Sequence, residues 1–82
     1  MKAIIIKVNY QLARAVFERD DGEYGWLEIL DSTELEEGEI VKGDFSGLGD
    51  TTIHKEDGET VDVYIEDFCS LSIALDMSFP KN

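Results

Sequence analysis

One histidine, one cysteine and many carboxylates are the side chains most able to do chemistry in this sequence. His54 lies between Ile53 and Lys55 near a predicted hairpin. A catalytic histidine needs a nucleophile and an orienting group beside it, and the local sequence supplies neither. Acid catalysis by a carboxyl group needs burial that raises its pKa, whereas these carboxylates crowd into predicted turns. We therefore expect a protein that is not an enzyme and has no catalytic residues.

The same side chains predict no metal and no cofactor. Cys69 is the only cysteine, so an intramolecular disulfide and a cysteine-based zinc site are both excluded. No segment has the pattern of an EF-hand calcium loop, and turn acids such as Asp20, Asp21 and Asp57 are expected to be solvated. Gly43–Gly49 lacks the Gly-Lys-Ser/Thr ending of a phosphate-binding loop.

The charge of the chain is its most unusual property. Nineteen acidic residues stand against seven Lys and Arg, which gives a net charge of −12 on 82 residues. Affinity for nucleic-acid backbones comes from Lys and Arg that displace counterions, so this charge disfavours a nucleic-acid partner. The acids cluster in three segments interleaved with apolar residues, Glu18–Glu23, Asp31–Glu39 and Glu56–Asp67. They predict a folded acidic surface, which either only keeps the domain soluble or mimics a polyanion.

The first half of the chain is predicted to form three strands, Lys2–Asn9, Gln11–Arg19 and Tyr24–Leu30. In the first strand, alternation places Ile4, Ile6 and Val8 on one face. The second segment also has helical spacing, so a helix capped by Asn9 is the alternative there. Asp20–Glu23 contains an Asp-Gly pair and is predicted as a hairpin turn.

The second half is predicted to add three shorter strands, Glu39–Phe45, Thr51–Lys55 and Thr60–Ile65. Asp31–Glu37 is polar and acidic, and we expect a loop or a single helical turn there. Ser46–Asp50 has two glycines and is predicted as a flexible turn. Glu56–Glu59 contains a second Asp-Gly pair and is predicted as a second hairpin turn.

The segment Cys69–Phe79 is predicted as a further, half-buried strand. Six apolar residues alternate in it with smaller or polar ones, and a period of two is typical of a strand with one buried face. A helix from Asp67 is the alternative, because it would bring Phe68, Leu71 and Leu75 together. If the barrel closes without this segment, its apolar face needs a partner, and a symmetric homodimer is the commonest solution.

Short strands separated by glycine turns predict an all-β fold, specifically a small OB-like barrel of five or six antiparallel strands. The length predicts one domain over residues 1–82. No stretch approaches the length of apolar sequence that a transmembrane helix needs, and no signal-peptide core follows the N-terminus. We therefore expect a cytoplasmic protein without membrane association.

Residues 1–45 resemble the cold-shock domain, an OB-fold barrel related to S1-type RNA-binding domains. The similarity lies in the layout of Lys7–Asn9 at the end of the first strand, Glu18–Gly22 in the first hairpin turn, and Leu35–Val41 at the entry to a later strand. The second half of the chain is longer than the family pattern and matches it poorly.

This resemblance implies binding of single-stranded nucleic acid on a sheet face, where bases stack on aromatic side chains. At the corresponding positions this chain has Lys7, Arg14 and Val16 instead of aromatics, while Trp26 keeps one and Glu28 adds a carboxylate. Arginine stacked on an exposed indole contributes about 0.5–1 kcal/mol. The expected binding residues are therefore Lys7, Arg14, Trp26 and Glu28.

The acidic net charge and the loss of aromatic residues from the sheet face together predict a small acidic, non-catalytic binding or protein-interaction module. The alternatives are a degenerate single-stranded nucleic-acid binder of cold-shock type, and an acidic nucleic-acid mimic that occupies a basic protein surface. The expected partner is a protein.

Overall fold

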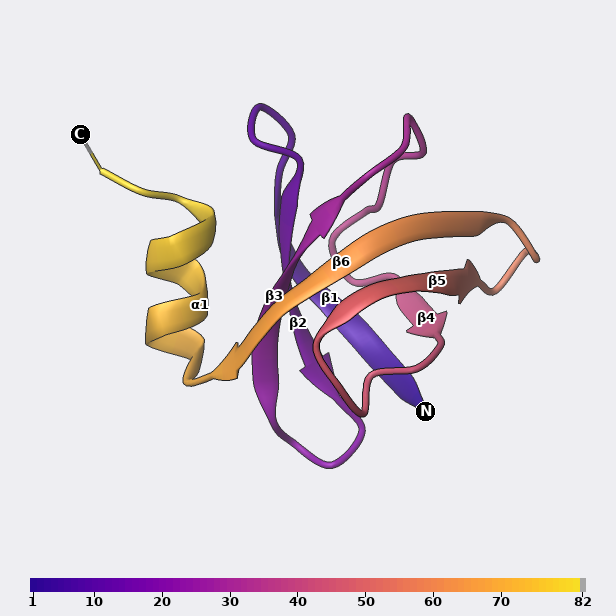
Figure 1. Cartoon of the computed structure of the whole chain (residues 1–82), viewed down its shortest axis with the longest axis horizontal. Coiled ribbons are helices and arrows are strands. Elements are labelled where there is room, and N and C mark those ends of the chain that lie inside the picture. The colour runs from indigo at the N-terminus through magenta and orange to yellow at the C-terminus, as the bar shows by residue number, and fades with distance from the viewer. Residues whose placement is uncertain (82) are drawn as a thin grey trace.

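The strands of the protein close into a barrel. The structure is a computed structural model that describes residues 1–81. Six antiparallel strands follow one another around the barrel in the order β1-β2-β3-β6-β5-β4, and β4 pairs back to β1 (Figure 1). The elements are β1 (Lys2–Asn9), β2 (Arg14–Arg19), β3 (Tyr24–Ile29), β4 (Ile40–Lys42), β5 (Gly49–Lys55), β6 (Thr60–Cys69) and α1 (Leu71–Ser78). The predicted small all-β barrel is confirmed, with six strands, and it is compatible with an OB-like fold.

The barrel interior is filled by apolar side chains. The largest are Phe17 and Phe45, whose ring centroids lie 5.0 Å apart, and Phe68 meets Phe17 edge-on at 6.1 Å. The rest of this core is contributed by every strand and by Leu35 of a loop: Ala3, Ile5, Val8, Ala15, Leu27, Val41, Ile53, Val61, Val63 and Ile65. Gly25 makes room for the Phe17 ring, because a Cβ there would lie 2.7 Å from its Cζ and 2.5 Å from the Asp67 carbonyl oxygen.

The alternation of strand faces is interrupted in β6, where the pairing with β3 shifts register between Ile65 and Asp67, and in β1. In β1 the prediction that Ile4, Ile6 and Val8 share one face is wrong, since Val8 points into the barrel with Ala3 and Ile5, whereas Ile4 is exposed. The pairing with β2 shifts register between Ile5 and Lys7. Such an irregularity places one extra residue in the strand and exchanges its two faces, which a period-two pattern cannot reveal.

The turn between β1 and β2 lies in a segment for which a strand and a helix were the two predictions, and both are wrong for its first residues. Gln11–Arg19 is neither a strand throughout nor a helix, because β2 begins only at Arg14. The Asn9 Oδ1 atom accepts hydrogen bonds from the backbone N–H groups of Gln11 and Leu12, which holds a tight turn between β1 and β2. Ala13 completes the turn with φ 54°, a left-handed conformation that is unfavourable for alanine.

The two predicted Asp-Gly hairpins are present. Gly22 (φ 88°) and Gly58 (φ 92°) take positive φ in the β2–β3 and β5–β6 turns. A cation at the base of each turn pairs with the acids around it. Arg19 binds Asp21 and Glu23 at 2.7 and 2.8 Å, and the second cation, Lys55, lies 3.3 Å from a carboxylate of its own turn. Both turns therefore offset part of their own charge.

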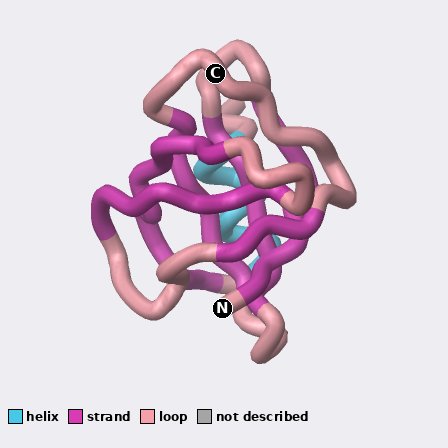
Figure 2. Tube along the Cα trace, turned by 90° about the vertical axis from the view of Figure 1, so that its right-hand side faces the viewer, coloured by secondary structure: helices cyan, strands magenta, loops and turns pink. Residues whose placement is uncertain are grey.

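The predicted strand over Cys69–Phe79 is wrong. β6 ends at Cys69, and Leu71–Ser78 form α1, which lies along the outer side of the barrel (Figure 2). The barrel is already closed by β4, so no strand edge remains to pair with another strand. Ser70 caps the helix, since its Oγ atom accepts a hydrogen bond from the Ile73 N–H. The helical alternative was right for the segment but placed its start too early, because Phe68 belongs to β6 and the barrel core.

The side of α1 that carries Leu71, Ala74 and Leu75 packs on its own barrel, whereas Ile73 and Met77 remain exposed. The homodimer stays a prediction. Within residues 1–81, α1 is the only helix, and none there has the length and apolar character needed to cross a membrane.

Candidate binding surfaces

The four predicted binding residues do come together on one side of the barrel wall. In the strand register, Lys7 of β1 pairs with Val16 of β2, and Val16 pairs with Trp26 of β3. Arg14 pairs with Glu28 in the neighbouring row. Cross-strand partners on one face have Cβ atoms about 4.5–5.5 Å apart, so these four residues lie close together on the wall formed by β1, β2 and β3.

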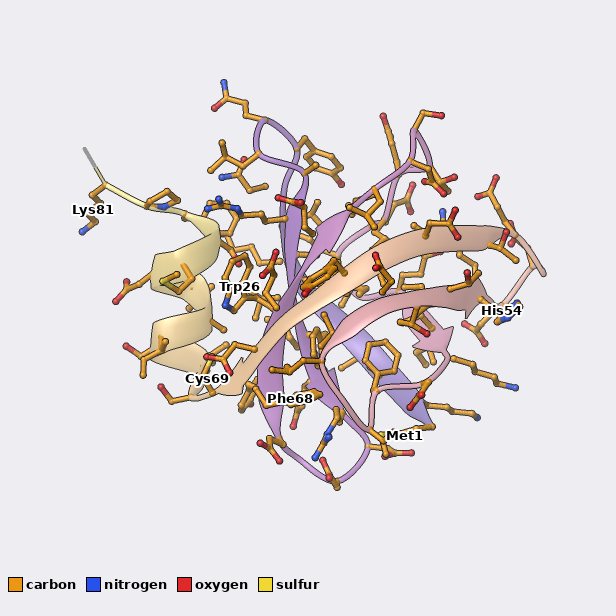
Figure 3. The ribbon with its side chains drawn as sticks, in the orientation of Figure 1. Met1, Trp26, His54, Phe68, Cys69 and Lys81 are labelled. Atoms are coloured by element: carbon orange, nitrogen blue, oxygen red, sulfur yellow. The ribbon has the colours of Figure 1, made fainter. Side chains whose placement is uncertain are left out.

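That face is not open, because α1 lies on it. Trp26 is only 8% exposed and forms a second apolar cluster with Val16 and Ala74, to which four half-buried residues add: Ile6, Cys69, Leu71 and Leu75. Figure 3 shows Trp26 between β3 and α1. We call this set the outer cluster. Stacking of any other ring on Trp26 requires α1 to leave.

The two predicted cations hold the C-terminal end of α1. The Arg14 Nη1 atom donates a hydrogen bond to the Met77 carbonyl oxygen at 2.8 Å, and the guanidinium carbon lies 5.3 Å from the Trp26 ring centroid. The Lys7 Nζ atom lies 5.3 Å from the Phe79 ring centroid. The last carbonyls of a helix lack intrahelical partners and carry partial negative charge, so cations are well matched to them.

Asn9 also contacts the C-terminal end of α1, and the sequence analysis did not predict this contact. Its Nδ2 atom donates a hydrogen bond to the Ser78 carbonyl oxygen at 2.8 Å, while its Oδ1 atom organises the β1–β2 turn. Asn9 and Ser78 are 69 positions apart, and no local pattern signals the pairing. We call Lys7, Asn9 and Arg14 the polar clamp.

Between α1 and the barrel, two polar atoms have no hydrogen-bond partner among residues 1–81. Ser78 is fully buried, and its Oγ atom makes no hydrogen bond; the same is true of the Arg14 Nε atom. A buried polar group without a partner costs about 1–3 kcal/mol. The contact between α1 and the barrel is therefore less favourable than its apolar residues alone would make it.

A second outer face, on β3, β6 and β5, is open. Its centre is Tyr64, which is 39% exposed and is paired in register with Glu28 on one side and Asp50 on the other. Asp62 lies two positions earlier in β6 on the same face and accepts a hydrogen bond from the Thr52 hydroxyl. We call Glu28, Leu30, Asp50, Asp62 and Tyr64 the acidic face.

The acidic face combines unpaired charge with exposed apolar surface. Within residues 1–81, the ion pairs involve only Arg19 and Lys55, so the carboxylates of this face have no cationic partner within ion-pair distance. Leu30 is 48% exposed at its edge. A groove of about 360 Å³ opens there between Leu30, Asp50 and Asp62, with Thr51, Thr52 and Val63 as its remaining walls.

A groove of similar volume, about 370 Å³, lies on the opposite part of the wall and has a mixed rim. Ile4 and Ile40 form its apolar floor as a cross-strand pair of β1 and β4. Its lining holds two cations and two acids, Lys2, Arg19, Glu18 and Asp20. The Asp20 carboxylate accepts a hydrogen bond from the backbone N–H of Lys2, and Arg19 binds turn acids. This groove favours no particular charge on a partner.

The remaining candidates for chemistry are scattered. His54 is exposed near the end of β5, remote from Cys69 at the end of β6 (Figure 3). Burial, and then the charge of Asp67, raise the pKa of the Cys69 thiol and so disfavour the reactive thiolate. Among residues 1–81, no group of three or more His, Cys, Asp or Glu side chains is placed to hold a metal ion.

Several acids are tied to the backbone instead. The N–H groups of Asp62 and Thr33 donate to the Asp31 carboxylate and lower its pKa. The Glu23 N–H and Arg19 lower the pKa of Asp21. These carboxylates stabilise turns and loops, and Asp31 does so at the border of the acidic face, where it binds the N–H of Asp62.

The fold and its surfaces define a small all-β barrel with one outer face covered by its own helix and another left open and acidic. No family model matches the chain, and neither a curated protein nor a solved structure matches it.

Proposed function

We propose that this protein is a small, non-catalytic protein-binding module whose acidic face binds a basic surface of a partner protein. The observation that carries the proposal is Tyr64, an exposed aromatic residue between two carboxylates, Glu28 and Asp50, that have no cationic partner among residues 1–81. The net charge of −12 attracts a partner of opposite sign over the whole surface.

The chemistry of the acidic face suits a lysine or arginine side chain. A cation over the face of a tyrosine ring gains about 0.5–1 kcal/mol when exposed and more when desolvated. A carboxylate on each side of the ring adds charge-assisted hydrogen bonds, which are the stronger kind. Arginine fits best, because its planar fork stacks on an aromatic ring and still donates to a carboxylate.

Leu30 and its groove supply the apolar part of the contact. Binding energy in protein interfaces concentrates in a few buried anchors, and exposed ion pairs at the rim contribute little. We therefore expect the partner to present an apolar side chain beside its basic ones. This combination distinguishes a specific partner from a polycation held by charge alone.

The same proposal includes the absence of catalysis and cofactors and a cytoplasmic location. A single, partly buried cysteine supports a compartment in which disulfides do not form. An acidic mimic of nucleic acid is a special case of this function, in which the basic surface of the partner normally binds phosphates.

A titration with a short arginine-rich peptide containing one leucine tests the proposal. The peptide should shift the backbone amide resonances of Glu28, Tyr64 and Asp50 on the acidic face. Tyr64→Ala should weaken binding about three- to tenfold, which corresponds to the cation–π contribution at a partly desolvated site. Added salt should weaken binding further, because the carboxylates contribute through screened charge.

A matched pair of charge variants separates the acidic face from general attraction. Glu28→Gln and Glu34→Gln remove the same charge, one from the acidic face and one from an exposed loop. Only Glu28→Gln should reduce affinity by more than about twofold. Equal effects of the two variants, together with no effect of Tyr64→Ala, would rule out a specific acidic face.

The cold-shock resemblance supports a second candidate, binding of single-stranded nucleic acid at Lys7, Arg14 and Trp26. What favours it is that both cations do lie near Trp26 on one wall of an OB-like barrel. Trp26 would have to emerge from beneath α1, so a short single strand should change its fluorescence at low salt. Unchanged fluorescence at low salt would remove this candidate.

A further inference from the structure

We propose that the outer face of β2 and β3 is a helix-docking site, which α1 occupies within the chain and which a short amphipathic helix of a partner protein can occupy in its place. The site consists of Ile6, Val16 and Trp26 together with the polar clamp. It adjoins the acidic face at Glu28 but shares no residue with it, so either proposal can fail without the other.

The barrel does not need α1 to be complete. All six strands are paired around the closed barrel, and its interior core contains no residue of α1. The helix adds only Leu71, Ala74 and Leu75 to the outer cluster and is joined to β6 through the single residue Ser70. Eight residues are too few for a helix that is stable in water by itself, so α1 is ordered by the face that holds it.

The polar clamp recognises helix ends in general. Arg14 and Asn9 donate to backbone carbonyl oxygens of Met77 and Ser78, which are main-chain groups that every helix presents at its C-terminus. Nothing in these two contacts depends on the side chains of α1. Arg14 and Asn9 therefore suit any helix that ends at this point of the face, whereas Lys7, the third member of the clamp, contacts the Phe79 ring.

Sequence selectivity comes from the residues that α1 turns toward the barrel. Ala74 is fully buried between Val16 and Trp26, where a larger side chain has no room. Leu71 and Leu75 pack on either side of it. The partner helix should therefore carry an apolar residue, a small residue three positions later, a second apolar residue directly after, and a small residue three positions further on.

The fourth position is where α1 fits badly. The Ser78 Oγ atom is buried and has no hydrogen-bond partner within the described residues 1–81, and such a group opposes docking. A helix with alanine at this position keeps the carbonyl contact with Asn9 and loses the unpaired hydroxyl. Such a helix should bind the face more tightly than α1 does, which gives a partner a means of displacing α1.

The experiment uses the full chain with α1 disabled by a substitution in the helix alone. Ala74→Glu places a carboxylate against Val16 and Trp26 and should lift α1, while the docking face keeps its own residues. Ser72→Glu adds the same charge to the exposed side of α1 and is the matched control. Emission from Trp26, the only tryptophan, should shift to the red in the first variant and stay unchanged in the second.

A synthetic peptide of residues 70–81 is then added to the Ala74→Glu chain. It should reverse the shift of Trp26 emission, and a peptide that itself carries Ala74→Glu should bind at least about tenfold more weakly. A peptide with Ser78→Ala should bind about tenfold more tightly than the native peptide, the change expected for removal of one unpaired buried hydroxyl. Equal binding of all three peptides overturns the proposal.

Amide exchange in the native sequence provides a test that does not depend on a disruptive variant. The amides of α1 should exchange at least about tenfold faster than those of the barrel strands, and Ser78→Ala should slow only the α1 amides. One common exchange rate for helix and barrel, or loss of barrel protection in Ala74→Glu, would make α1 an integral part of the fold and overturn the proposal. A concentration-dependent dimer with protected α1 amides would assign the site to a second copy of the chain. That result would overturn the proposal that a helix of a partner protein binds there.

Discussion

The barrel interior and the outer cluster are both apolar, but they are held together in different ways. The interior core is enclosed on all sides by paired strands, and its large side chains are fully buried. The outer cluster lies between one wall of the barrel and a short helix, and it depends on three polar side chains that hold the helix end. Ile73 and Met77 of that helix remain 51% and 47% exposed.

This difference shows that the inner and outer faces of the same strands have different roles in the protein. Phe17 of β2 points inward and joins strands distant in sequence, whereas its neighbour Val16 points outward to the helix. Inward residues determine whether the chain folds. Outward residues determine what covers or contacts the folded barrel, and changes there are free to alter binding without unfolding the protein.

The largest expected effect is loss of the interior core. Phe17→Ala removes a fully buried ring that contacts both Phe45 and Phe68, and we expect a loss of about 3–5 kcal/mol in the free energy of unfolding. A domain of this size has little stability to spare. Denaturant titration followed by far-UV circular dichroism measures the loss, and a value near zero would contradict the assigned core.

A smaller effect is expected from the outer cluster. Leu75 is only partly buried under α1, so Leu75→Ala should destabilise the protein by about 1–2 kcal/mol, below the range for a fully buried leucine. The loss should appear mainly as faster amide exchange within α1. If Leu75→Ala and Phe17→Ala cost the same and melt the barrel alike, the distinction between the two clusters is wrong.

A substitution in the β1–β2 turn is expected to increase the stability of the protein. Ala13 has a left-handed backbone that glycine adopts without strain, so Ala13→Gly should raise the stability by about 0.5–1 kcal/mol. Thermal unfolding of the variant beside the native protein measures the gain. Ala15→Gly is the control, because Ala15 is a buried strand residue where glycine should only destabilise.

The smallest expected effect concerns pH. The folded protein holds the pKa of Asp31 below its ordinary value through the N–H groups of Asp62 and Thr33. A lowered folded pKa adds stability at pH values above the unfolded pKa of about 3.9, and that stability is lost as the pH falls through the folded pKa. Asp31→Asn should therefore lower the melting temperature slightly at pH 7, and the difference should vanish near pH 2.

Much of the barrel could be predicted from local patterns. Alternating apolar residues in Tyr24–Leu30 and Thr60–Ile65, with Asp-Gly turns beside them, were enough to locate the hairpins, since side-chain alternation and turn preferences are properties of short segments. The cold-shock resemblance, and not alternation, was what grouped Lys7, Arg14, Trp26 and Glu28. Alternation failed at the β1 irregularity, where register depends on the neighbouring strand.

The structure of the C-terminal segment could not be predicted from local sequence patterns. Its alternation suits a strand and its spacing also suits a helix, and only the closed barrel decided between them by leaving no edge for a seventh strand. The contacts of Asn9 and Arg14 with the end of α1 join residues more than 60 positions apart, and no pattern in either segment predicts them.

The sequence by itself determined the charge, the strand-rich architecture and the faces of most strands, because these follow from composition and from a period of two. Only the tertiary structure decided that Trp26 is covered and Tyr64 is open, since both residues point outward from neighbouring strands and differ only in whether a helix lies above them. Burial of an outward residue is a property of what packs on it, and that partner comes from elsewhere in the chain.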